Sequence, residues 1–192
     1  MDNKKRTSRQ RILAAAAEVA NEAGAGNLSL DAVALRAGVS KGGLLYNFPT
    51  KAKLLQGLVE NYIANFEQAL AAATDASRGD TTTLLAAYVT LSAEECRSMA
   101  KPPSGLLAAM AEDPDFMRPA KAHKRSLLDR LMTGTPDAAR VLNAFLVVEG
   151  LRSLKLLDMD ILTEAEMELV LSELLAEAGT ADRVSSGDLA AV

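Results

Sequence analysis

The segment 28–55 is the part of the sequence that most constrains the fold, because it places two short helices about a tight turn. Ser29 and Ser40 have side chains of the kind that cap helix N-termini. Gly38 lies between the two expected helices, where a backbone with positive φ costs a glycine little. We therefore expect one short helix after Ser29 and a second, very short one that begins at Ser40 and ends near Asn47.

The rest of the chain also carries the pattern of helices. Pro49 prevents the second short helix from continuing, and Thr50 caps a long helix that runs to about residue 76. Apolar residues recur at helical spacing elsewhere, and we find neither strand-like alternation nor repeats of about 20–50 residues. The further predicted helices span 7–23, 82–98, 104–112, 115–132 (with Pro119 as a candidate break), 136–157 and 163–178. The predicted fold class is all-α.

Charge is distributed unevenly along the chain. Residues 1–55 hold nine Lys and Arg against four Asp and Glu, a net charge of +5, although the whole chain carries −4. This asymmetry favours a polyanion at the front of the chain and disfavours one at the back. A solvated basic tail on an acidic protein is the alternative interpretation.

Two lysines of this basic segment, Lys41 and Lys51, each follow a capping hydroxyl residue and therefore lie in the first turn of a helix. A cation there opposes the helix dipole by about a few tenths of a kcal/mol. A lysine beside a helix N-terminus nevertheless suits a phosphate oxygen. Two such helix starts in one short segment indicate DNA as the partner.

Two glycines, Gly42 and Gly43, stand inside the very short helix. Each costs about 1 kcal/mol relative to alanine, so their presence makes sense if another molecule comes close to this helix. A simple loop is the alternative, but Leu44, Leu45 and Phe48 give the segment an apolar inner face. A short helix, a glycine turn and a second short helix form a helix-turn-helix, whose second helix lies in the major groove of DNA.

Many residues of this region also carry a family pattern: Arg11, Ile12, Leu13, Ala15, Ala16, Gly24, Leu28, Ser29, Leu30, Ala34, Ala37, Gly38, Val39, Ser40, Gly42, Leu45, Tyr46, Phe48, Lys51 and Leu54. With them, residues 7–60 resemble the TetR family of bacterial one-component regulators. The resemblance implies a three-helix helix-turn-helix domain in residues 1–60. A long helix would join it to a helical effector-binding and dimerisation domain in residues 61–192.

The resemblance also implies roles for single residues. Ser29 would cap the first helix of the motif and bind a phosphate. Ser40, Lys41, Gly42 and Leu44 would face the groove, with Lys41 as the best candidate for a base or phosphate contact.

The same resemblance implies that the Tyr46 hydroxyl binds a phosphate and that Lys51 clamps another at the start of the next helix. Gly43 departs from the family pattern, because members usually carry threonine or serine there and one hydroxyl contact is therefore missing. Asn47 stands where histidine is more frequent, although its amide can still donate a hydrogen bond. Both departures concern sequence preference rather than fold.

The apolar pattern in the C-terminal part of the sequence predicts a homodimer. The run 144–148 is apolar around the whole helix 136–157, so that helix must be covered on two sides. The last helix has a wide apolar stripe made of Met167, Val170, Leu171, Leu174, Leu175 and Ala178. We expect these two helices to pair with those of a second copy in a four-helix bundle. Such a dimer would present two recognition helices to successive major grooves about 34–36 Å apart.

Methionines concentrate in the middle of the chain. This composition suits an adaptable pocket for a small lipophilic effector, but plain core filling explains it equally well. The residues predicted to line the pocket are Met99, Leu106, Met110, Phe116, Met117, Met132 and Phe145.

Several classes of protein are disfavoured. Cys96 and His123 are the only cysteine and histidine, so an internal disulfide is impossible and a His/Cys zinc site lacks ligands. No cofactor is expected, and no catalytic motif supports an enzyme. We expect a soluble cytoplasmic protein, because the sequence has neither a signal peptide nor an apolar run of membrane-spanning length.

The predicted function is that of a ligand-responsive repressor, which binds a near-palindromic operator in double-stranded DNA as a homodimer. The alternative is a helical adaptor or structural protein without sequence-specific DNA binding.

Overall fold

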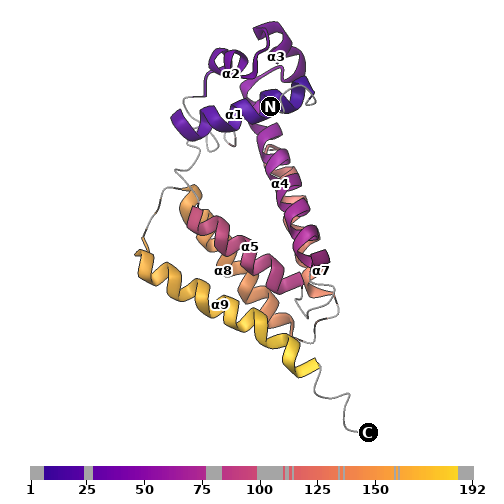
Figure 1. Cartoon of the computed structure of the whole chain (residues 1–192), viewed down its shortest axis with the longest axis vertical. Helices are drawn as coiled ribbons and strands as arrows, with labels where there is room; N and C mark the ends of the chain where they lie inside the picture. Colours follow the sequence, from indigo (N-terminus) through magenta and orange to yellow (C-terminus); the bar gives the residue numbers. More distant parts are fainter. Residues whose placement is uncertain are drawn as a thin grey trace. The chain divides into compact units, whose positions relative to one another are not determined.

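The computed structural model describes residues 7–23, 28–76, 84–98, 110, 113, 115–133, 135, 137–157, 159 and 161–185. Its helices are α1 (Ser8–Ala23), α2 (Leu30–Ala37), α3 (Lys41–Asn47), α4 (Lys51–Ala76), α5 (Leu84–Ser98), α7 (Arg118–Met132), α8 (Ala138–Leu156) and α9 (Glu164–Ser185) (Figure 1). No strand occurs within these ranges, which confirms the all-α prediction. The predicted helix 104–112 lies outside the described residues except for Met110. No helix in the described part is long and apolar enough to cross a membrane.

Two predicted features of the later helices are wrong. α9 does not stop before Gly179 but continues to Ser185. A glycine ends a helix when it adopts a left-handed conformation, and Gly38 is the one described glycine with positive φ. Pro119 does not break α7, because it lies in the first turn, where its missing N–H would have no helical partner anyway.

The backbone forms two compact units. The first comprises residues 1–64 with 100–123, and the second comprises residues 65–99 with 124–192. The sequence predicted a boundary between two domains after residue 60, and that boundary remains a prediction.

The first unit has a core built by α1, α2, α3 and the start of α4. Its fully buried side chains include Ile12 from α1, Val33 from α2 and Leu44 from α3. Gly38 ends α2 with a φ of 63°, as the turn required. α1, α2 and α3 therefore pack around one shared apolar core.

Gly57 in α4 belongs to this core and has a steric role that the sequence did not reveal. A Cβ at this position would lie 2.7 Å from Cε1 of Phe48 and 3.2 Å from Cδ2 of Leu13. Both neighbours are buried, so they have little room to move. α4 can approach them this closely only because residue 57 has no side chain.

The second unit has a core between α5, α7, α8 and α9, to which Phe66 and Leu70 of α4 also contribute. Tyr88 is fully buried there, edge-on to Phe66 with ring centroids 6.2 Å apart and stacked on Phe145 at 6.0 Å. Burial raises the pKa of the Tyr88 hydroxyl, so this residue stays neutral within the core.

Arg152 of α8 forms the centre of a charged network in the second unit. Its guanidinium donates to Oε2 of Glu95 at 2.6 Å and to Oε1 of Glu149 at 3.0 Å. It also donates to Oγ of buried Ser92 at 3.2 Å. Glu149 in turn forms an ion pair with Lys124.

The same guanidinium lies over two aromatic rings, 4.9 Å from the centroid of Phe66 and 5.9 Å from that of Tyr88. The network therefore connects α4, α5, α7 and α8. Removing one member of such a half-buried group leaves a charge that is only partly compensated.

We predict that Gly57→Ala lowers the free energy of unfolding by about 1–3 kcal/mol, the usual cost of an overpacked core. Urea denaturation of the full chain measures this change. The matched control is Gly42→Ala, because a Cβ there meets only Oγ of Ser40 at 4.0 Å. A Gly57→Ala variant as stable as Gly42→Ala would contradict the assigned close approach.

Candidate functional site

The inner face of α3 is set by two side chains one helical turn apart. Leu44 is 0% exposed, and Phe48, which follows the helix, is also buried in the first core. The prediction that Leu44 faces a DNA groove is therefore wrong. On a helix of seven residues, positions i and i+4 share one face, and here that face packs inward. Leu45, which the sequence assigned to the inner face, is instead exposed.

The outer face of α3 is open to solvent. Lys41 and Gly42 are exposed, and the side chain of Tyr46 is 90% exposed. A large aromatic residue this exposed, one turn from a glycine, has no role in the core. Its phenol can donate a hydrogen bond to a phosphate.

Three hydroxyl residues cap the helices around this face. Oγ of Ser40 accepts a hydrogen bond from the N–H of Gly43 at 3.0 Å, and Oγ of Ser29 accepts from that of Ala32 at 3.4 Å. Oγ1 of Thr50 accepts from the N–H of Lys53 at 3.1 Å. As acceptors of these bonds, both exposed serines keep their hydroxyl hydrogens as donors towards a partner.

The two glycines of α3 differ in how much space a side chain would find at their positions. A Cβ at Gly43 would lie 3.3 Å from Oγ of Ser40, so a side chain there would press on the capping hydroxyl. At Gly42 the same atom is 4.0 Å away and is the one contact found among the described residues. Gly42 is therefore not required by the packing of its own chain, and its absent side chain leaves space for another molecule.

Lys41 is ion-paired within the first unit. Its Nζ lies 3.0 Å from Oδ1 of Asp31, at the start of α2. Both side chains are exposed, and a pair of this kind contributes only about 0–1 kcal/mol. A phosphate can therefore replace Asp31 as the partner at little cost.

Other basic residues of the front segment are also paired, which the charge count could not show. Arg36 binds Glu22 through two hydrogen bonds of 2.7 and 2.8 Å, which lower the pKa of that carboxyl and raise that of the guanidinium. Arg9 lies 3.5 Å from Glu60. The positively charged surface of the unit is consequently smaller than the count of basic residues in 1–55 suggested.

The remaining two residues predicted to bind DNA lie at the end of α3 and the start of α4. Nδ2 of Asn47 donates to the carbonyl oxygen of Gly43 at 2.8 Å, so one of its amide hydrogens serves its own helix. Lys51 is the first residue of α4 and is half-buried.

The residues predicted to bind an effector are distributed over both units. Met99 and Leu106 lie outside the described residues. Met110 is exposed, Phe116 is buried and Met117 is half-buried, all three within the first unit. Phe145 is buried in the second core, where Met132 packs against the same cluster. Their shared pocket remains a prediction.

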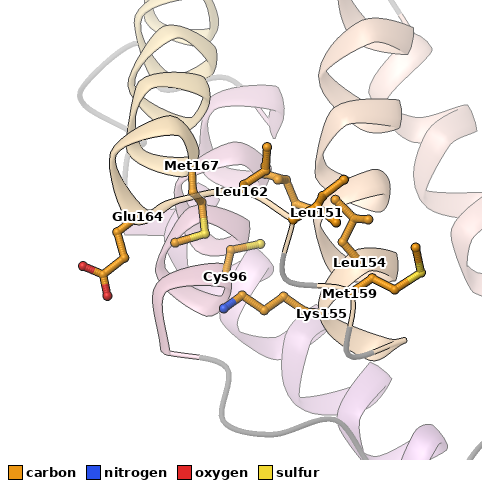
Figure 2. Close-up of a pocket in the computed structure, with 9 residues that line it drawn as sticks. Cys96, Leu151, Leu154, Lys155, Met159, Leu162, Glu164 and Met167 are labelled. Atoms are coloured by element: carbon orange, nitrogen blue, oxygen red, sulfur yellow. The ribbon is translucent and has the colours of Figure 1, made fainter.

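The second unit contains a pocket of about 230 Å³ that the sequence did not reveal (Figure 2). Its lining residues are Cys96, Leu151, Leu154, Lys155, Met159, Ile161, Leu162, Glu164 and Met167. None of the predicted effector residues is among them. In the described part of the chain, no three His, Cys, Asp or Glu side chains are grouped so that they could hold a metal ion.

Comparison with known families assigns the chain to a class. Residues 12–58 match the family described as bacterial regulatory proteins of the tetR family. Residues 82–179, just over half of the chain, match the tetracyclin repressor-like C-terminal domain. The protein is thus a transcriptional regulator with a helix-turn-helix. It belongs to the TetR family, whose members bind DNA.

Solved structures share the fold. A transcriptional regulator from Rhodococcus sp. Rha1 has a TM-score of 0.65 at 22% identity, with 91% of this chain and 95% of that chain covered. A TetR-family member from Streptomyces coelicolor A3 has 0.61 at 24% identity, with 88% and 98% covered. The multidrug binding protein EbrR, complexed with malachite green, has 0.59 at 25% identity, with 86% and 96% covered. Among curated proteins, none matches the chain.

The open space at Gly42 leads to a prediction that separates stability from binding. Gly42→Ala should raise the free energy of unfolding by up to about 1 kcal/mol, because alanine is the better helix former. The same methyl group should weaken DNA binding about tenfold, equivalent to ~1.4 kcal/mol of steric cost. Urea denaturation and fluorescence anisotropy with a labelled duplex measure the two effects. Unchanged affinity in the folded variant would count against a close approach at this glycine.

Proposed function

We propose that the protein is a ligand-responsive transcriptional repressor that binds a near-palindromic operator as a homodimer. The observation that carries this proposal is that α3 has one face buried in the core and one face exposed to solvent. Leu44 anchors the helix in the core, while Lys41, Gly42 and Tyr46 occupy an exposed surface with no evident role in packing. A short helix held in this way suits insertion into a major groove.

Each residue at this surface has a role in the proposed complex. Lys41 would exchange Asp31 for a phosphate or a base edge, and the Tyr46 hydroxyl would donate to a phosphate. Gly42 would let the DNA come close to the helix backbone. Ser29, Ser40 and Lys51 would hold phosphates at three helix starts, and Gly43 and Asn47 would complete the face. Phosphate contacts would position the helix, and groove contacts would select the sequence.

The second unit supports a homodimer through α8 and α9. α8 buries Val141, Phe145 and Val148 in its own core, yet Leu146 on another face is 64% exposed. On α9, Leu169 is 69% exposed although the apolar stripe of that helix packs inward. Exposed leucines on two helices of the same unit suit an isologous interface, in which the same patch serves both copies.

The ligand response rests on a known relative of the same fold. EbrR is described as a multidrug binding protein and was solved with malachite green. A comparable lipophilic effector here would favour one separation of the two recognition helices. The effector would bind the protein more tightly at this separation than at the separation that fits the operator. It would lower operator affinity by the difference between those two binding free energies. Action on chromosomal DNA would place the protein in the cytoplasm.

The proposal is tested by DNA binding across a salt series, with a duplex selected by the protein from genomic fragments. Phosphate contacts predict that log affinity falls steeply as log salt rises. Lys41→Ala should flatten this slope by about 0.9, the contribution of one phosphate contact. Tyr46→Phe should weaken binding and leave the slope unchanged, because it removes a neutral donor. Lys121→Ala, an exposed lysine of α7, is the matched control.

Two results would favour the alternative of a helical adaptor. One is that no fragment is selected or that the slope is near zero. The other is that Lys41→Ala and Tyr46→Phe both bind the selected duplex as tightly as the natural chain.

The interface has a separate prediction. Combining Leu146→Glu with Leu169→Glu should raise the dimer dissociation constant about a hundredfold or more, because a carboxylate desolvated in an interface costs several kcal/mol. Both residues are exposed, so the fold of the single chain should survive. Sedimentation velocity over a range of concentrations measures the change. Leu35→Glu, an exposed leucine of α2, should leave the dissociation constant as it was.

A further inference from the structure

The pocket in the second unit has no role in the proposed DNA contacts or dimer contacts. It lies where the end of α5, the end of α8 and the start of α9 meet, and the chain between α8 and α9 completes it (Figure 2). Cys96 comes from α5, Leu151 and Leu154 from α8, and Met167 from α9. The pocket is therefore separate from the residues that the sequence predicted for an effector.

The volume of the pocket limits its occupant to a small molecule. At about 230 Å³ it exceeds the ~150 Å³ of an apolar cavity that holds benzene. It is smaller than the roughly 300–1,000 Å³ of pockets for drug-sized ligands. One six-membered ring with a small substituent fits this range.

Most side chains that line the pocket are apolar. Leu151 is buried and Leu154 is half-buried, whereas Met159, Ile161 and Leu162 of the connecting chain are exposed. Removing apolar surface of this kind from water is favourable. An occupant with an apolar surface would cover these side chains and bind for that reason.

Among the lining residues, no charged group is both unengaged and directed into the pocket. Lys155 already has an interaction within the chain, and Figure 2 shows the Glu164 carboxylate pointing away from the other lining side chains. Glu168, next to Met167, accepts two hydrogen bonds from Arg97 at 2.6 and 3.0 Å. A charged molecule would lose its water here without gaining a compensating charge. The pocket therefore suits a neutral molecule.

The thiol of Cys96 contributes a weak hydrogen-bond donor rather than a charge. It is 1% exposed, and burial raises its pKa above the ordinary value. The thiol consequently stays protonated at neutral pH. Since the thiolate is the species that binds metals, this wall of the pocket also favours an uncharged organic occupant.

Sulfur is concentrated in this lining. Cys96, Met159 and Met167 are three of its nine residues, although the whole chain of 192 residues has one cysteine and seven methionines. Sulfur makes favourable contacts with the edges of aromatic rings, and methionine adapts its shape to an irregular occupant. Figure 2 shows the three sulfur atoms spread across the lining rather than gathered around one point. This distribution suits a flat ring better than a single metal ion.

We propose that this pocket binds a neutral molecule with one aromatic ring, of the size of toluene. The ring would lie among Leu151, Leu154 and Met167, with sulfur atoms at its edge. The site does not depend on DNA binding, so its test stands whether or not the proposed function holds.

The class of ligand is tested by titrating the full chain with 4-fluorotoluene and following the ¹⁹F resonance. Binding should saturate at one molecule per chain. 4-Fluorobenzoate and 4-fluorobenzylamine carry opposite charges on the same ring, and both should bind at least about tenfold more weakly, because each would lose water without a compensating charge. 1-Fluoro-4-methylcyclohexane has the same carbon skeleton without aromatic electrons, and it should bind about two- to tenfold more weakly.

The place of binding is tested through Cys96, the only cysteine of the chain. The full chain is treated with iodoacetamide, a neutral reagent, and alkylation is followed by mass spectrometry. 4-Fluorotoluene at ten times its dissociation constant should slow the reaction about tenfold, because only unoccupied protein reacts.

Variants separate the pocket from the rest of the surface. Leu154→Trp should fill the pocket and lower the affinity for 4-fluorotoluene at least about tenfold, whereas Leu35→Trp, at an exposed leucine of α2, should leave it unchanged. Met167→Leu should weaken 4-fluorotoluene about two- to tenfold and leave the cyclohexane analogue unchanged, because it removes only the sulfur. Met132→Leu, at a methionine that packs against the second core outside this pocket, is the matched control. Thermal melts confirm that each variant is folded.

Several outcomes would overturn the proposal. Either charged ring could bind as tightly as 4-fluorotoluene, or the cyclohexane analogue could bind as tightly as the aromatic ring. Leu154→Trp could bind 4-fluorotoluene as the natural chain does, or saturating 4-fluorotoluene could leave the alkylation of Cys96 unchanged. Absence of saturable binding up to the solubility limit of 4-fluorotoluene would have the same force.

Discussion

The burial of Leu44 in the first core is the contact on which the candidate DNA-binding face depends. α3 is only seven residues long, so its own hydrogen bonds cannot keep it helical in water. Leu44 and Phe48 fix the rotation of the helix against α1 and α2. With that rotation set, Gly42 and Tyr46 must face away from the core. The orientation of the outer face is therefore a consequence of apolar packing on the inner one.

Local signals predicted the helices of the first unit well. Ser29, Gly38, Ser40 and Thr50 act at short range, and the starts and ends of α1 to α4 agree with the predicted bounds to within one residue. The face of Leu44 was predicted wrongly because a family pattern gives the position of a residue in the motif, whereas its direction follows from packing. Charge counting failed for a related reason. Asp31 and Lys41 are ten residues apart, and only the turn at Gly38 brings their side chains together.

Features that need contacts between distant segments could not be predicted. Gly57 carries no local signal, because what excludes a side chain there is Phe48 and Leu13. The pocket beside Cys96 is built from three helices and the chain between two of them. By contrast, the apolar run of α8 was informative, because a helix with apolar residues all round must be covered on every side. Phe145 and Val148 are buried, and the exposed Leu146 marks the side that the single chain leaves uncovered.

The network around Arg152 determines how the second unit can deform. Apolar side chains can slide past one another with small losses, but the 2.6 Å ion pair between Arg152 of α8 and Glu95 of α5 is directional and short-ranged. A shift of one residue along a helix moves a side chain by about 1.5 Å and turns it by about 100°. Such a shift in α5 or α8 would separate Arg152 from a carboxylate that has little access to water. These helices should therefore move as a single block.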